Sequence, residues 1–369
     1  MNLFRIVSIY RTPKVISLFK KSSVFPITRN SDSEALFKTN RYFLLVIGII
    51  LFSSLSQINA DGYIGIIGIR NSGEHVFETG NKYPNLSGIQ GGSRITYQRN
   101  FNLGGIEAGY FKNKFSIRGK FTTNGWYQNS GGARDEDFFL KSNSPERGSK
   151  FSPFQGNLYD TAYTYSGTNN FADGKGRATI SEYNAEGFFR YHIGESSPDP
   201  WVTNSGIFLS FGLRYSYSKL YVYDVMQFVA TRPIFYGPIG YGLSYSYSFT
   251  EIPIGGGYIF SFGNFKIEPS FHLLYAFIKT RDFHAQRALN FLAYSSGPGF
   301  ISRLELNYII SEKSIFKMAF TGHRQFTSGH FTTKGGITES DILSNYLGIY
   351  GTYINTKEVL YDFGFILKL

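Results

Sequence analysis

The sequence predicts an all-β protein: a ten-stranded antiparallel transmembrane β-barrel of up-and-down topology. Three observations lead to this fold class. Aromatic residues make up 18% of the 369 residues, with 28 Tyr and 37 Phe, whereas charged residues make up only 17%. Mean hydropathy is −0.17, which is too low for a helical membrane protein. Apolar and polar residues alternate along many segments, as they do in strands with one face toward lipid and the other toward water.

The first element expected is a secretory signal peptide with a long leader, over residues 1–60. An apolar run of 11 residues, YFLLVIGIILF (42–52), follows Lys38 and Arg41 and precedes the small residues of SSLSQINA. This order is typical of a signal peptide, and cleavage is expected after Ala60. An uncleaved membrane anchor is the alternative. The remaining chain has 29 Lys and Arg against 24 Asp and Glu, and no basic motif indicates a nucleic-acid partner.

The barrel is expected to occupy residues 61–369. In its last segment Tyr361, Phe363 and Phe365 lie on one face, and Asp362 and Gly364 lie on the other. The alternation therefore pairs an aromatic face with a polar one, which suits lipid outside and a polar lumen. The ten predicted strands are 63–73, 93–111, 114–124, 178–193, 206–222, 240–260, 264–280, 299–310, 314–326 and 358–369.

The connections between these strands alternate in length. Those after the even-numbered strands are short, for example 261–264 and 311–313, whereas the longest, 125–177, follows the third strand. In an antiparallel barrel, the connections after odd-numbered strands all emerge at one rim, and those after even-numbered strands emerge at the other. Bacterial barrels have short periplasmic turns and long extracellular loops. We therefore expect a protein of the cell outer membrane whose long loops face the extracellular side.

Common catalytic and metal motifs are missing from the sequence. It contains no G-x-S-x-G, H-E-x-x-H or G-x-x-x-x-G-K-[ST] segment. With no Cys, disulfides, thiol catalysis and thiolate metal sites are excluded. The six His include no pair at helical metal-ligand spacing, so neither a metal nor another cofactor is expected.

Two short acidic clusters are candidates for chemistry. One is the segment RDEDFF at 134–139, which contains Asp135 and Asp137. The other follows the seventh strand, where counting by two from the lumenal side chains places Asp282 and His284 inward at the extracellular rim. An imidazole held by a carboxylate can act as a general base on water, and a facing carboxylate pair can hold that water. The alternative is that these acids merely belong to polar loops.

At these motifs the chain resembles the omptins, outer-membrane endopeptidases built as ten-stranded barrels. RDFHAQRALNF (281–291) is similar to the family's D-x-H-x-x-R segment, and DEDF (135–138) is similar to its D-x-D followed by an aromatic residue. GEHVF (73–77) is similar to its Glu-x-Val-Tyr stretch. The motif order and the strand pairing also fit, so the resemblance extends over the whole of 61–369.

The resemblance implies a peptide-bond hydrolase of the aspartic-type endopeptidase class, with no covalent intermediate. By this carry-over Asp282 and His284 activate the water, and Asp135 with Asp137 binds it from the facing wall. Family members cleave at basic residues and need lipopolysaccharide for activity. Glu74 matches one carboxylate of the pocket for the basic side chain. Thr280 stands where the second carboxylate would be, so the preference for basic residues is expected to be weakened.

Two other functions remain open. One is a non-enzymatic barrel, either an adhesin or a narrow pore. A wide pore is disfavoured, because ten strands leave little lumen once charged side chains fill it. The other is a lipid-acting enzyme, which would need a Ser–His pair on the outer wall. The partners expected are polypeptide substrates and outer-membrane lipid, and the barrel is expected to be a monomer. The side chains expected to fill the lumen are Arg214, Lys266, Glu268, Arg303 and Glu305.

Overall fold

The computed structural model describes residues 61–81, 89–141, 170–229, 235–236, 240–339, 341–342 and 350–369. The predicted signal peptide at 1–60 lies outside the described residues, as does most of the long connection predicted at 125–177. No helix in the described part of the chain is long and apolar enough to cross a membrane.

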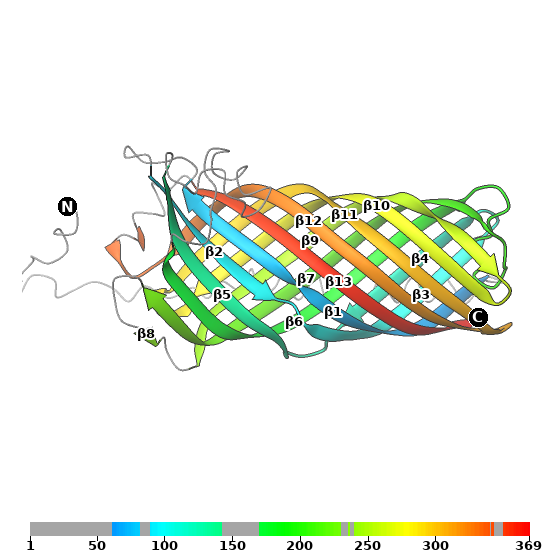
Figure 1. Ribbon diagram of the computed structural model, residues 1–369, viewed down its shortest axis with the longest axis horizontal. Coiled ribbons are helices and arrows are strands. Elements are labelled where there is room, and N and C mark those ends of the chain that lie inside the picture. Colours follow the sequence, from blue (N-terminus) through cyan, green and yellow to red (C-terminus); the bar gives the residue numbers. More distant parts are fainter. Residues whose placement is uncertain are drawn as a thin grey trace, which may run out of the picture. The chain divides into compact units, whose positions relative to one another are not determined.

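The described residues form one antiparallel sheet of thirteen strands (Figure 1). The strands are β1 Gly62–Asn81, β2 Ile89–Gln98, β3 Phe101–Lys112, β4 Phe115–Thr123, β5 Gln128–Lys141, β6 Asn170–His192, β7 Gly206–Val229, β8 Phe235–Tyr236, β9 Tyr241–Phe262, β10 Phe265–His284, β11 Leu289–Ser311, β12 Ser314–Gly335 and β13 Tyr350–Lys368. A 3-10 helix, η1, covers Ala285–Arg287.

The sheet closes into a ring because β1 pairs with β13 along its whole length, from Tyr63 opposite Lys368 to Asn81 opposite Tyr350. On its other edge β1 pairs first with β3 and then with β2. β3 and β2 follow one another along the same edge of β1, so together they fill one strand position of the ring. β4 and β5 fill the next position in the same way, between β3 and β2 on one side and β6 on the other. The thirteen strands therefore make a ring of about ten.

The predicted strands need three corrections. The second is divided in two at Arg99–Asn100, whereas the third corresponds to β4 alone. Most others extend well beyond the predicted ends, and 128–141, predicted to be part of a loop, is strand β5. The connection from β6 to β7, predicted to be short, runs from 193 to 205, whereas 263–264 and 312–313 are tight turns as predicted. Gly263 has φ 56°, a left-handed conformation that glycine adopts without strain.

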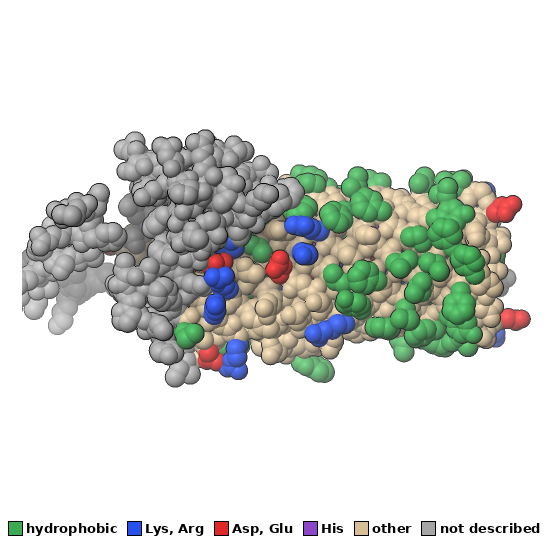
Figure 2. Space-filling model, in the orientation of Figure 1, with side chains coloured by type: hydrophobic (Ala, Val, Ile, Leu, Met, Phe, Trp, Pro, Cys, Tyr) green, Lys and Arg blue, Asp and Glu red, His purple; other side chains and the backbone are tan. Residues whose placement is uncertain are grey.

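The outer wall carries an apolar belt near the end where the C-terminus lies. Figure 2 shows hydrophobic side chains gathered there, with Lys and Arg side chains farther along the barrel. On β10 the exposed outward residues run from Phe271 to Phe277 and are followed by Lys279 and Arg281. Charged side chains facing outward mark where the belt ends, because lipid chains do not solvate them. Exposed belt residues on other strands include Ile66, Ile106, Ile117, Phe189, Leu209, Leu306, Met318 and Phe363.

Candidate active site

β10 carries the first pair of candidate residues beyond the apolar belt. Buried and exposed residues alternate along this strand without a break from Ser270 to Asp282. Asp282 therefore faces inward, as the sequence predicts, and is only 2% exposed. Its Oδ1 atom has no hydrogen-bond partner in the described part of the chain. The strand thus presents a buried carboxylate with one free oxygen.

His284 ends β10 and lies against this carboxylate. Its Nε2 is 3.0 Å from Asp282 Oδ2. The Phe291 ring packs edge-to-face with the imidazole, with 5.2 Å between ring centroids. The hydrogen bond and the aromatic contact together hold the imidazole in one orientation, as a general base requires.

Asp135 and Asp137 lie on the facing wall, on β5. This strand pairs with β2, which places Ile95 opposite Asp135 and Ser93 opposite Asp137. The Ser93 hydroxyl donates a hydrogen bond to Asp135 Oδ1 at 3.2 Å. Because the pairing of β5 with β2 is unbroken through both positions, spacing by two puts both carboxylates on the same face of the wall.

The charges of the two walls act on one another. Burial and the neighbouring Asp137 carboxylate raise the pKa of Asp135 to about 7, although His284 and the Ser93 hydrogen bond act in the opposite direction. Burial alone would lower the pKa of His284, but the charge and hydrogen bond of Asp282, with the charge of Asp135, raise it to about 9. The structure therefore brings the four predicted residues into one electrostatic neighbourhood.

The structure does not bring Glu74 into this neighbourhood. Side chains at odd positions of β1 face inward, from Tyr63 to the buried His75 and Phe77, whereas Glu74 is exposed on the outward face. The assignment of Glu74 to a lumenal pocket is therefore wrong. The physical reason is strand parity, since a residue next to an inward one must point outward.

Thr280 does face inward, one step below Asp282, and is 2% exposed. Its hydroxyl lies close enough to Tyr245 to affect the pKa of that phenol. The predicted position is therefore occupied by a buried, uncharged side chain.

A buried aromatic layer next to the site was missed by the sequence reasoning. His75 stacks on Tyr247 at 4.1 Å with 4° between the ring planes, and Tyr97 stacks on Tyr245 at 4.7 Å. Both ring nitrogens of His75 are hydrogen-bonded at 2.8 Å, Nδ1 to Thr356 and Nε2 to the Tyr245 hydroxyl. Parity along β1 could have identified His75, but contacts between distant strands could not be read from the sequence.

Arg287 was also given no role by the sequence reasoning. It lies in η1, directly after His284, and forms an ion pair with Asp341. Its positive charge acts to lower the pKa of His284, against the raising effect of Asp282. It also acts to lower the pKa of Asp137, but burial raises that pKa by more. A cation therefore lies close to both walls of the site.

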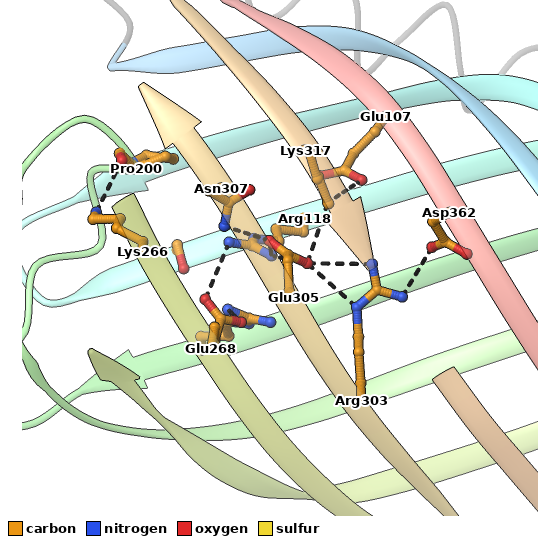
Figure 3. Close-up of polar contacts among 12 residues, drawn as sticks. Glu107, Arg118, Pro200, Lys266, Glu268, Arg303, Glu305, Asn307, Lys317 and Asp362 are labelled. Carbon is orange, nitrogen blue, oxygen red and sulfur yellow. Dashed lines mark hydrogen bonds and ion pairs between the residues drawn. The ribbon is translucent and has the colours of Figure 1, made fainter. Parts of the chain in front are cut away.

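A network of ion pairs fills the lumen farther along the barrel (Figure 3). Glu305 lies at its centre, 3.1 Å from Arg118, 3.2 Å from Arg303 and 3.3 Å from Lys317. A cavity of about 60 Å³ remains among these side chains, room for only a few waters. The five residues predicted to fill the lumen all take part in such polar contacts.

The described residues include no group of three or more His, Asp or Glu arranged to hold a metal ion. What the arrangement offers chemically is an imidazole–carboxylate pair opposite two carboxylates that share a raised proton affinity. Such a set can take a proton from a bound water without any metal or covalent intermediate.

The fold is similar to that of a solved outer-membrane protein. The outer membrane protease OmpT from Escherichia coli is similar in structure, with a TM-score of 0.62 at 12% identity, over 84% of this chain and 98% of that chain. The translocator domain of the autotransporter NalP from Neisseria meningitidis also matches, with a TM-score of 0.33 at 10% identity, over 89% and 97% of the two chains. No curated protein sequence matches the chain.

The likeness to OmpT shows the fold alone. The family described as "Putative porin" matches residues 82–363, which is most of the barrel. The closed antiparallel ring and the apolar belt on its outer wall fit this match. The chain therefore belongs to the "Putative porin" family and is an outer-membrane β-barrel.

Proposed function

We propose that this barrel is an outer-membrane endopeptidase. The observation that carries the proposal is the Asp282–His284 pair, 3.0 Å apart, facing Asp135 and Asp137 from the opposite wall. A water held between the walls is the nucleophile. No Ser, Thr or Cys nucleophile is needed.

The chemistry follows from the two walls. Neutral His284 takes a proton from the water while the water oxygen bonds to the peptide carbonyl carbon, and the Asp282 carboxylate stabilises the imidazolium that forms. Asp135 and Asp137 accept hydrogen bonds from the water and hold it against the carbonyl carbon. The imidazolium then protonates the leaving nitrogen as the C–N bond breaks, which restores neutral His284.

The likeness of the fold to an outer membrane protease supports the proposal. We further propose that the site faces the extracellular side, that polypeptides are the substrates and that the barrel acts as a monomer. Outer-membrane lipid, including lipopolysaccharide, is the expected partner of the apolar belt.

A second candidate function is a diffusion pore, which the family's description favours. The interior of the described barrel opposes it. Lys317 lies 2.6 Å from Glu107, and Arg190 lies 2.6 Å from Glu268, so charged side chains from different walls meet inside the lumen. A pore would need a continuous water path past these pairs.

The test is peptide cleavage by the refolded full-length protein and its His284→Ala variant. We expect the variant to lose cleavage by several orders of magnitude while keeping the heat-resistant gel mobility of a folded barrel. His330→Ala is the matched control, because His330 is exposed on the outer face of β12 beside Tyr294. Full cleavage by the His284 variant would overturn the proposal.

A further inference from the structure

The walls around the proposed site also determine which side chain a substrate can place there. This inference rests on the proposed function and concerns the residue that precedes the cut. A site that accepts Arg or Lys needs a carboxylate to replace the water that the cation loses. The question is therefore which carboxylates the inner face offers.

The β1 wall offers none. Glu74 points outward beside Lys357 and Gln98, its register partners on β13 and β2. The inward residue at that level is His75, which is fully buried. Both of its nitrogens are hydrogen-bonded, to Thr356 and Tyr245, and burial keeps its pKa well below the usual value. This wall is therefore uncharged where the resemblance implied an anion.

The β10 wall offers none either, apart from Asp282 itself. Thr280 contributes a hydroxyl, and its register partner on β9 is Tyr247, part of the aromatic layer. Tyr245 and Tyr97 stack on one another beside it. A side chain that entered here would meet aromatic rings and hydroxyls.

The other carboxylates nearby are held by arginines. Arg94 lies 2.8 Å from Glu78 and 4.0 Å from Glu136, and Asp341 pairs with Arg287. The carboxylates that remain for a cation in the described part of this site are those proposed to hold the water and the imidazole. A cation bound to them would displace the water.

We propose that the site selects an uncharged residue before the scissile bond. Substrates with Arg or Lys at that position bind unproductively or not at all, because the guanidinium or ammonium group loses water without gaining a carboxylate. Hydroxyl-bearing, small and aromatic residues lose little when they enter a wall of rings and hydroxyls.

The experiment compares kcat/KM for matched peptides that differ only in the residue before the cut, using the refolded full-length protein. We expect uncharged residues to be cleaved at least tenfold faster than Arg. Thr280→Asp should raise the ratio of Arg to uncharged cleavage at least tenfold. Thr280→Asn, which has the shape of the Asp variant but no charge, should not. Glu74→Gln should leave the ratio unchanged.

The outcomes separate the two proposals. Preference of the wild type for Arg, reduced by Glu74→Gln, would overturn the specificity inference and leave the endopeptidase intact. The wild-type ratio decides this even if Thr280→Asp fails to fold. Failure of the folded wild type to cleave any peptide in the set would overturn the proposed function, and the specificity inference with it.

Discussion

The two walls of the site hold protons more tightly than isolated side chains do. The pKa of His284 is raised to about 9 by Asp282 and Asp135, against the effect of burial. A general base must be neutral to accept a proton. The geometry that orients the imidazole therefore also keeps it protonated at neutral pH, and activity depends on removing that proton.

We expect kcat/KM to rise as the pH increases from 6 and to level off near pH 9. Below a pKa of about 9, the neutral fraction of His284 increases tenfold per pH unit. The measurement is a pH–rate profile on a peptide without titratable side chains. Maximal activity at or below pH 6 would contradict the assignment of His284 as base.

Replacement of Asp282 by Asn should move this profile as well as lower it. Without the carboxylate, burial becomes the larger influence on His284 and lowers its pKa, so the plateau should begin at a lower pH. We expect kcat to fall strongly at the same time, since the imidazolium loses its stabilising charge. A reduced rate with an unmoved plateau would indicate that Asp282 only supports the fold.

At the scale of single residues, the sequence predicts the inward side chains of β10 better than those of β1. Counting by two along β10 correctly places Asp282, because the alternation is unbroken from the belt to the rim. The placement of Glu74 in a lumenal pocket rests only on the similarity of residues 73–77 to a family motif. Counting from Tyr63, Ile67 and Ile69 would have placed His75 inward instead.

At the scale of elements, the break between β2 and β3 is held by one buried arginine. Arg99 is 1% exposed, and its guanidinium lies 2.7 Å from both Glu182 on β6 and Glu358 on β13. Its backbone N–H still donates to Gly73 O at 2.9 Å. The wall is thus continuous across the break, and three strands are joined through one side chain.

We expect Arg99→Met to destabilise the barrel by about 3–5 kcal/mol, because two buried carboxylates then lose their cation. The readout is the temperature at which the protein loses its compact gel mobility. Arg70→Met is the control, since Arg70 is exposed on the outer face of β1. Equal transitions for the two variants would show that the ion pairs at the break contribute nothing.

The strand ends could be predicted only where the belt marks them. Inside the belt, lipid on one face and polar side chains on the other give a clear alternation. Beyond it apolar and polar residues mix on both faces, as at Tyr353 and Ile354 of β13, which are neighbours in the chain and are both buried. The apolar period then vanishes although the backbone pairing continues, and for this reason most strands are longer than predicted.

At the scale of the whole molecule, paired charges from different walls cross the described lumen. We expect no stable single-channel conductance from the refolded protein in planar bilayers, because ions would have to displace paired charges such as Arg118 and Glu305. A refolded porin of similar size serves as the positive control. Reproducible conductance steps would favour the pore over the enzyme.

The proposed orientation can be tested because the chain contains no Cys. Glu339 lies at the end of the barrel that carries the site, and Glu312 lies in the β11–β12 turn at the other end; both are exposed. We expect a membrane-impermeant maleimide to label Glu339→Cys, and not Glu312→Cys, on intact cells. Labelling of Glu312→Cys and not of Glu339→Cys would show that the site faces the periplasm.

The lumenal ion pairs also constrain the order of assembly. Lys317 and Glu107 are 210 positions apart in the chain, and Arg118 and Glu305 are 187 apart. Neither pair can form until strands from both halves of the sequence have come together. A partly assembled ring therefore carries unneutralised charge on its inner face, and contacts of such long sequence separation form slowly. We expect ring closure and charge neutralisation to be one late, cooperative event, so that intermediates with a finished interior and an open seam do not accumulate.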